Sequence, residues 1–117
     1  MSNLYELISK IQKRPSMYLG KPAISNLRSC IAGYILARRE LAVAQTEQEK
    51  GFTEFQSWVQ EKFNISSSQS WDKIILFYSE DEREALERFF ELFQEYLKLN
   101  HLEFKSFDSS SEPFIKS

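Results

Sequence analysis

The sequence predicts an all-α protein: a single-domain bundle of about five helices with a short irregular C-terminal tail. Apolar residues recur at spacings of three and four in several segments, which is the signature of amphipathic helices. The chain of 117 residues contains only three Gly and three Pro, too few for the many tight turns of a β-sandwich. That length fits one domain, and an aromatic content of 15% can fill its core. We expect the helical domain to span residues 1–107 and a flexible tail to span 108–117.

The first helix is predicted to follow Asn3, which forms a capping-box pattern with Glu6. Its apolar residues lie on one helical face: Leu4, Leu7, Ile8 and Ile11. Pro15 disfavours helical geometry at the residue before it, so the helix should end at or before Arg14.

The second helix is predicted from a cap at Ser25 to about Gln45. Gly33 inside it costs about 1 kcal/mol relative to Ala, which we explain by close packing against another helix. The polar residues 45–51 predict a loop.

The third helix is predicted over residues 53–63, with Thr53 as its cap, and the Ser-rich residues 65–71 predict a loop. Ser70 can cap a fourth helix that reads WDKIILFYS. The run KIILFY is also compatible with a buried strand, because periodicity alone does not separate the two. We favour the helix because a single strand has no evident partner.

The fifth helix is predicted from a capping box at Ser79 and Glu82. It has the widest apolar face of the chain, formed by Ala85, Leu86, Phe89, Phe90, Phe93, Tyr96 and Leu97. From about Asn100 the sequence is polar, with a short extended piece predicted through Leu102 and Phe104.

The residues that usually carry enzyme chemistry are sparse, so we expect no catalytic activity, no cofactor and no metal. His101 is the only histidine and Cys30 the only cysteine, whereas zinc needs several such ligands at defined spacings. One cysteine forms no internal disulfide, and no apolar run approaches the roughly 18 residues of a membrane span. The N-terminus lacks the layout of a signal peptide. We therefore expect a cytoplasmic protein that does not contact membranes.

The string RPSMYLG separates the first two helices. It is similar to a motif of the gyrase B and Hsp90-like ATPases, but the following helix lacks the Asn and Asp residues of that superfamily. A glycine-rich ATP lid is absent as well. We therefore interpret the string structurally: Arg14 and Pro15 stop a helix, Met17 and Tyr18 pack inward, and Gly20 permits a positive φ.

Four glutamates form a stripe along the fifth helix: Glu84, Glu87, Glu91 and Glu95. At about 100° per residue they fall within roughly 80° of one another. Like charges four residues apart cost a few tenths of a kcal/mol per pair. The stripe is therefore either a solubilising face or an anionic surface for a cationic partner, which Asp81 would extend.

Charge is unevenly distributed along the chain. Residues 1–50 hold eight Lys and Arg against four Asp and Glu, whereas residues 51–117 hold seven against thirteen. The basic side chains of the N-terminal part are candidate phosphate contacts: Lys10, Lys13, Arg14, Lys21, Arg28, Arg38 and Arg39. They alternate with apolar residues that the core needs, and the overall pI is about 5.5. Nucleic-acid binding is an alternative that we do not favour.

The order of motifs resembles a group of small bacterial toxin-associated proteins. The matching strings are RPSMYLG, GY at 33–34, FTEFQSWV at 52–59, SQSW ending at Trp71, and DEREALERFFELF at 81–93. Members of the group look like immunity proteins of polymorphic toxin systems, including contact-dependent growth inhibition. The resemblance implies a cytoplasmic protein that binds and neutralises one cognate toxin.

We hypothesise that the acidic face covers the active or substrate site of such a toxin, which we expect to be a cationic nuclease. The face comprises Asp81, Glu84, Glu87, Glu91 and Glu95. A helical adaptor that binds a host protein is the other alternative. The sequence specifies neither the toxin nor an oligomeric state.

Overall fold

The computed structural model describes residues 3–100, which contain six helices and no strand. The helices are α1 (Leu4–Lys13), α2 (Pro15–Leu19), α3 (Ile24–Glu40), α4 (Glu47–Lys62), α5 (Trp71–Phe77) and α6 (Glu82–Leu99). The predicted all-α class is confirmed, and α2 is the helix that the sequence did not predict. The predicted extended piece and tail lie outside the described residues. None of the described helices is both long and apolar enough to cross a membrane.

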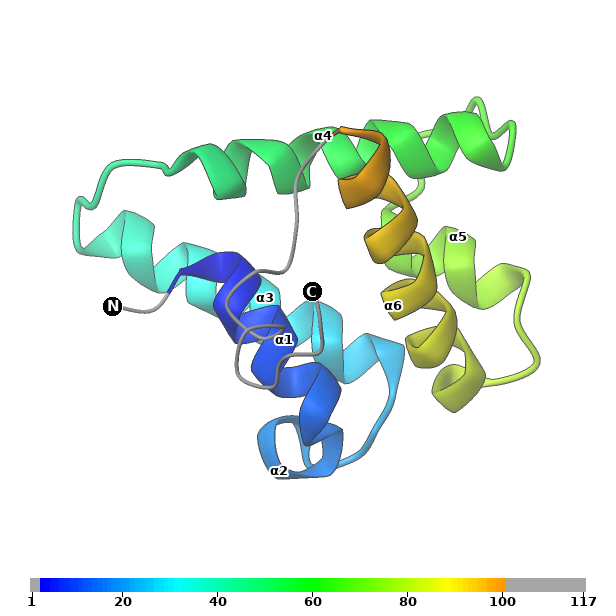
Figure 1. Ribbon diagram of the computed structural model, residues 1–117, viewed down its shortest axis with the longest axis horizontal. Helices are drawn as coiled ribbons and strands as arrows, with labels where there is room; N and C mark the ends of the chain where they lie inside the picture. The colour runs from blue at the N-terminus through cyan, green and yellow to red at the C-terminus, as the bar shows by residue number, and fades with distance from the viewer. Residues whose placement is uncertain (1–2, 101–117) are drawn as a thin grey trace.

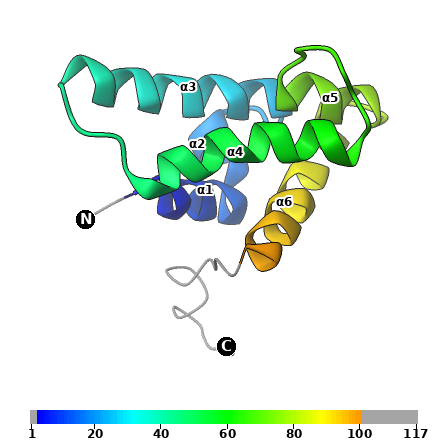
Figure 2. The same cartoon turned by 90° about the horizontal axis from the view of Figure 1, so that it is seen from above.

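Helix α6 lies between the α1–α2 pair and α5 (Figures 1 and 2). It packs against α3, α4 and α5, while α5 packs against α3, α4 and α6, and α1 packs against α2 and α4. The apolar face of α6 must therefore be wide enough to meet several neighbours.

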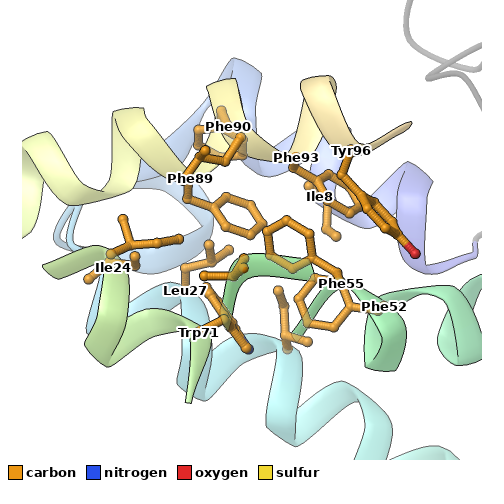
Figure 3. Close-up of a cluster of buried hydrophobic side chains, with 14 of the residues drawn as sticks. Ile8, Ile24, Leu27, Phe52, Phe55, Trp71, Phe89, Phe90, Phe93 and Tyr96 are labelled. Atoms are coloured by element: carbon orange, nitrogen blue, oxygen red, sulfur yellow. The ribbon is translucent and has the colours of Figure 1, made fainter. Parts of the chain in front are cut away.

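Stacked aromatic rings on α6 form the middle of the core (Figure 3). Phe89 and Phe93 stack with their centroids 5.5 Å apart, and Phe55 of α4 meets each ring edge-on. Trp71 of α5 contacts Phe89 at 5.0 Å, and Tyr5 of α1 meets Phe93 edge-on at 5.4 Å. Aromatic pairs contribute about 0.5–1.5 kcal/mol each beyond their buried area. The same rings thus join α1, α4 and α5 to α6.

The first corner of the chain agrees with the sequence prediction at its cap, at the end of α1 and at Gly20. The Asn3 side chain accepts a hydrogen bond from the Glu6 amide (2.8 Å), which confirms the predicted cap. The α1 helix ends at Lys13, and Gly20 closes α2 with a φ of 76°.

The predicted inward packing of Met17 and Tyr18 is wrong, because their exposed fractions are 67% and 40%. The string forms one short turn of helix, α2, rather than only a stop. Pro15 and Leu19 lie four residues apart on one face and are half-buried. Met17 occupies the opposite face of that turn and points to solvent, and Tyr18 lies at the edge of the half-buried face, where it stays exposed.

The start of α3 corrects another prediction, since its cap is Ala23 and not Ser25. Ser25 instead donates its amide (2.9 Å) and its hydroxyl (2.7 Å) to the carboxylate of Glu82 at the start of α6. The helix ends at Glu40, before the predicted boundary at Gln45. The predicted close packing at Gly33 is also wrong, because this residue is exposed and a Cβ there would meet no atom within 4 Å.

Helix α4 begins six residues earlier than predicted. Thr46 and Glu49 form a capping box, in which each side chain accepts a hydrogen bond from the other residue's amide at 3.1 Å. Residues 47–51, predicted as loop, are therefore helical. Thr53, the predicted cap, lies inside the helix, where its hydroxyl donates to the carbonyl of Glu49.

The segment after α4 resolves the choice between helix and strand, because α5 is a helix. Ser70 occupies its N-cap position without capping it. The side-chain oxygen of Gln56 on α4 accepts the Trp71 amide instead (2.7 Å). The cap of α6 is Asp81 and not Ser79, and its carboxylate accepts the Glu84 amide at 2.8 Å.

Two tyrosines bracket the N-terminal half of α4. Tyr96 of α6 donates its hydroxyl to the carbonyl of Gly51 (2.8 Å). A Cβ added to Gly51 would lie 2.8 Å from the hydroxyl oxygen of Tyr5 on α1. A side chain at position 51 would therefore require the Tyr5 hydroxyl to move, because α1 approaches α4 closely at this point.

The capping box at Thr46 gives a test of the α4 boundary. Thr46→Ala removes the N-cap acceptor and should reduce the free energy of unfolding by about 1 kcal/mol. Thr53→Ala is the matched control and should not destabilise the protein, because Ala has a higher helix propensity than Thr in a helix interior. Urea denaturation followed by circular dichroism measures both. Equal effects of the two substitutions would contradict the observed boundary.

Burial raises the pKa of Tyr5 to about 12, with smaller contributions from the charges of Tyr96 and Glu54. The unfolded state, with a pKa near 10.0, loses this proton first as the pH rises. Stability should therefore be fully present below pH 10 and fall between pH 10 and 12. Tyr5→Phe should reduce this fall, measured as urea midpoints against pH, whereas Tyr18→Phe at an exposed position should not.

Candidate functional site

The five predicted partner-binding acids do not share one environment. Asp81 and Glu84 stabilise the start of α6, since Asp81 caps the helix and the Glu84 carboxylate accepts the amide of Glu80 at 2.6 Å. Glu84 also lies 4.0 Å from Arg88. Glu95 forms an ion pair with Lys62 of α4 at 2.8 Å. These three carboxylates already have partners within the fold.

Glu87 and Glu91 differ from the other three. Both are exposed, and neither forms an ion pair with another residue of the described range. Both line a groove of about 800 Å³ that runs beside α6. The carboxylates that remain available for a partner are therefore the two in the middle of the helix.

The opposite wall of this groove comes from the RPSMYLG corner and its surroundings. Gln12 at the end of α1, Pro15 at the start of α2 and Pro22 line it there. Leu86 and Phe90 of α6 supply its apolar lining on the other side. Two features that the sequence analysis treated separately, the corner and the acidic stripe, thus form the two walls of one groove.

The corner owes its position to a few local interactions. Pro15 ends α1, and the carbonyl of Arg14 then accepts the amides of Met17 (3.1 Å) and Tyr18 (3.3 Å) to begin α2. Asn26 of α3 donates its side-chain amide to the carbonyls of Leu19 (3.1 Å) and Lys21 (3.2 Å). The Arg14 side chain is exposed and makes no ion pair within residues 3–100. The motif therefore contributes one wall of the groove, and the hydrogen bonds from Asn26 hold this wall against α3.

The groove carries charges of both signs along α6. Arg83 and Lys98 lie towards its two ends, and Glu87 and Glu91 lie between them. On a helix, residues four apart are neighbours, about 6 Å apart along the axis, so the two carboxylates form one acidic centre. Gln12 adds a polar group, because its side-chain oxygen is buried and accepts no hydrogen bond from a described residue.

Trp71, the remaining predicted motif residue, belongs to the core. Its side chain is 7% exposed and its ring contacts Phe52 at 5.5 Å in addition to Phe89. It holds α5 against α4 and α6 and does not line the groove.

Two observations on the described residues concern groups that can carry chemistry. Burial raises the pKa of the Cys30 thiol, which keeps it protonated and weakly nucleophilic at neutral pH. No group of three or more His, Cys, Asp or Glu side chains within residues 3–100 could hold a metal ion. The groove instead combines apolar surface, two carboxylates and an amide, which is the chemistry of a binding site.

No known protein family, curated protein sequence or solved structure matches this chain in sequence or fold comparison.

The sequence singled out Glu87 and Glu91 as partner-binding candidates, Pro15 as a helix stop, and Leu86 and Phe90 as core-facing residues, but it singled out neither Gln12 nor Pro22 as groove residues. Gln12 and Pro22 carry no sequence signal, because the fold alone brings them opposite α6. The contact between Ser25 and Glu82 joins residues that are 57 apart in the chain, and it likewise has no signal in the sequence. The capping box at Thr46 and Glu49 did have a signal, since Thr-x-x-Glu is a known N-terminal pattern.

Asn26 gives a test of how the groove wall is held. Asn26→Ala removes both hydrogen bonds to the α2 corner and should cost about 1–2 kcal/mol of stability. Hydrogen exchange of the Gly20 amide should then accelerate at least tenfold, while that of α4 amides changes little. Ser29→Ala, an exposed position one turn further along α3, is the control and should leave Gly20 exchange unchanged.

Proposed function

We propose that this chain is an immunity protein that binds and neutralises a cognate bacterial toxin in the cytoplasm. The observation that carries the proposal is the pair Glu87 and Glu91, two carboxylates that have no ion-pair partner among residues 3–100 and that line a groove beside a well-packed helical core. A surface helix gains no stability from adjacent like charges. We therefore assign Glu87 and Glu91 the role of contacting a cationic partner.

The partner chemistry that fits best is a cationic nuclease domain. Such an enzyme binds the phosphates of its substrate with Lys and Arg side chains. Carboxylates about 6 Å apart on a helix can occupy the positions of those phosphates and exclude the nucleic acid. Complementary charge also accelerates the encounter and disfavours wrong partners. The proposed inhibition is thus occlusion of a substrate site, without any reaction by the immunity protein.

The basic residues support a protein partner over a nucleic acid. Arg28 is paired with the buried carboxylate of Asp72 (3.2 Å), and Arg38 is paired with the buried carboxylate of Glu49. Both arginines therefore have internal partners. The remaining basic surface of the N-terminal half is smaller than the sequence alone suggests.

Charge reversal tests this proposal. The double substitution Glu87→Lys and Glu91→Lys should weaken binding to the proposed cognate toxin domain by about 2 kcal/mol per residue, or roughly a thousandfold in total. Co-expression should then fail to rescue cells from that toxin, while circular dichroism remains helical. Surface plasmon resonance of the purified pair measures the affinity.

The control carries the same change in net charge at a distance from the groove. Glu40→Lys with Glu61→Lys alters exposed positions on α3 and α4 that lie outside the groove. This variant should retain rescue and lose less than threefold in affinity. An equal loss of affinity in both variants would show that only net charge matters. Unchanged affinity in the Glu87→Lys, Glu91→Lys variant would refute the assigned surface.

A further inference from the structure

The exposed side of α2 carries side chains that the fold does not use. Met17 is 67% exposed and Tyr18 is 40% exposed. The carbonyl of Arg14 accepts the amides of both residues, so the three lie within one turn of the chain. Arg, Met and Tyr are among the residue types that are enriched where proteins bind one another. The composition of this turn therefore indicates a contact site for a protein.

The fold orders this turn in advance. Asn26 donates hydrogen bonds to the carbonyls of Leu19 and Lys21 at the end of α2, and Gly20 turns the chain there with a φ of 76°. Figure 1 shows α2 at one edge of the molecule, where another protein can reach it. A partner that packs on a preordered turn loses less conformational entropy than one that must order it.

The charge around Met17 and Tyr18 is positive. Residues 7–39 contain seven Lys and Arg and no Asp or Glu. Arg14 precedes α2 and Lys21 follows it, so these two cations bracket the apolar pair. Both are exposed, and neither forms an ion pair within the described part of the chain. An anionic occupant that carries an apolar side chain therefore complements the site in both respects.

The carboxylates nearest to Lys21 are engaged by the fold. Asp81 and Glu82 line a pocket together with Lys21. Asp81 is the N-cap of α6, and the carboxylate of Glu82 accepts hydrogen bonds from the start of α3. The unbalanced positive charge is therefore greatest at Arg14 and at Lys10, an exposed cation four residues before it.

The groove next to the corner determines which anionic occupant fits. Pro15 lines one wall of that groove, and Glu87 and Glu91 lie on the other. A bilayer or a nucleic acid placed over α2 would extend its charges across the groove towards these two carboxylates, and like charges repel. A compact acidic group on a protein reaches α2 without approaching them. The arrangement of charge thus favours a protein over an extended polyanion.

We propose, resting on the assigned immunity function, that the exposed side of α2 is a second contact with the toxin and binds a short acidic segment of it. An apolar side chain of this segment packs on Met17 and Tyr18. Carboxylates on either side of that side chain in sequence pair with Arg14 and Lys21. The recognised feature is an apolar residue between acids, so negative charge alone is insufficient.

The synthetic peptide Gly-Glu-Asp-Phe-Leu-Asp-Glu-Gly is the probe, because it places an apolar pair between acids. It should bind the full chain and shift the NMR signals of the Met17 methyl group and the Tyr18 ring. Replacing Phe and Leu with Ser, or the acids with Gln and Asn, should weaken binding about tenfold. Equal binding of the peptide without Phe and Leu would overturn the proposal.

Two protein variants test the two parts of the site. Met17→Ser with Tyr18→Ser removes the apolar surface, and Arg14→Gln with Lys21→Gln removes the cations. All four side chains are exposed, so the fold should tolerate both variants. Each variant should weaken peptide binding about tenfold. Unaltered binding by both, each with normal thermal unfolding, would overturn the proposal.

Matched controls change exposed side chains of the same types elsewhere on the surface. Leu36→Ser with Leu41→Ser controls for apolar area, and Arg39→Gln with Lys73→Gln controls for net charge. Both should bind the peptide normally, and a tenfold loss in either would overturn the assignment to α2.

Vesicles of phosphatidylglycerol and single-stranded DNA are the competing probes. Both should bind more weakly than the peptide, because Glu87 and Glu91 repel an extended polyanion. Tighter binding of either probe, lost in the Arg14→Gln, Lys21→Gln variant, would overturn the proposal and assign α2 to an extended anionic surface.

Affinity for the proposed cognate toxin domain distinguishes this inference from the immunity function. Met17→Ser with Tyr18→Ser should weaken that binding about tenfold. Full rescue and unchanged toxin affinity in this variant would retain the immunity role and overturn the contact through α2. Peptide binding that depends on both parts of the site, in a protein that fails to neutralise the toxin domain, would support α2 as a site for acidic segments and overturn the immunity role.

Discussion

Phe89 and Phe93 stack one turn apart on α6, and the other helices are arranged around this pair. Phe55 of α4 meets both rings edge-on, Trp71 of α5 contacts the first, and Tyr5 of α1 contacts the second. Aromatic pairs prefer offset-stacked or edge-on arrangements. The rings that α1, α4 and α5 contribute therefore help to set how these three helices lie against α6.

One face of α6 is buried in the core. Only the opposite face is therefore available to contact a partner. The outer face does not contribute to the core, and it carries Glu87 and Glu91, which form no ion pair with another of the described residues. Stability would favour a mixed-charge surface there, because like charges four residues apart repel. Natural proteins accept small stability losses where binding needs them. The acidic centre is consistent with such a compromise, and the corner at Pro15 converts a flat helix face into a groove.

The predictable parts of this fold are those that depend on near neighbours. Periodicity predicted five of the six helices, and Asn3 and Pro15 defined α1 because capping and proline geometry are local. Contacts between distant residues were not predictable. Ser25 looks like a cap in sequence, but the Glu82 carboxylate satisfies the start of α3 from another helix. Likewise the stripe of acids was visible in the sequence, while the wall that forms a groove beside two of them was not.

Gly51 links α1 and α6 through a single position on α4. The Tyr5 hydroxyl approaches it so closely that a Cβ would lie only 2.8 Å away, and its carbonyl accepts the hydroxyl of Tyr96. Substitutions at positions 5, 51 and 96 are therefore expected to depend on one another. In descendants of this sequence, a larger residue at 51 requires the Tyr5 hydroxyl to move, and a shorter side chain at position 5 would remove that conflict. One contact inside the fold therefore biases the order in which these substitutions can accumulate.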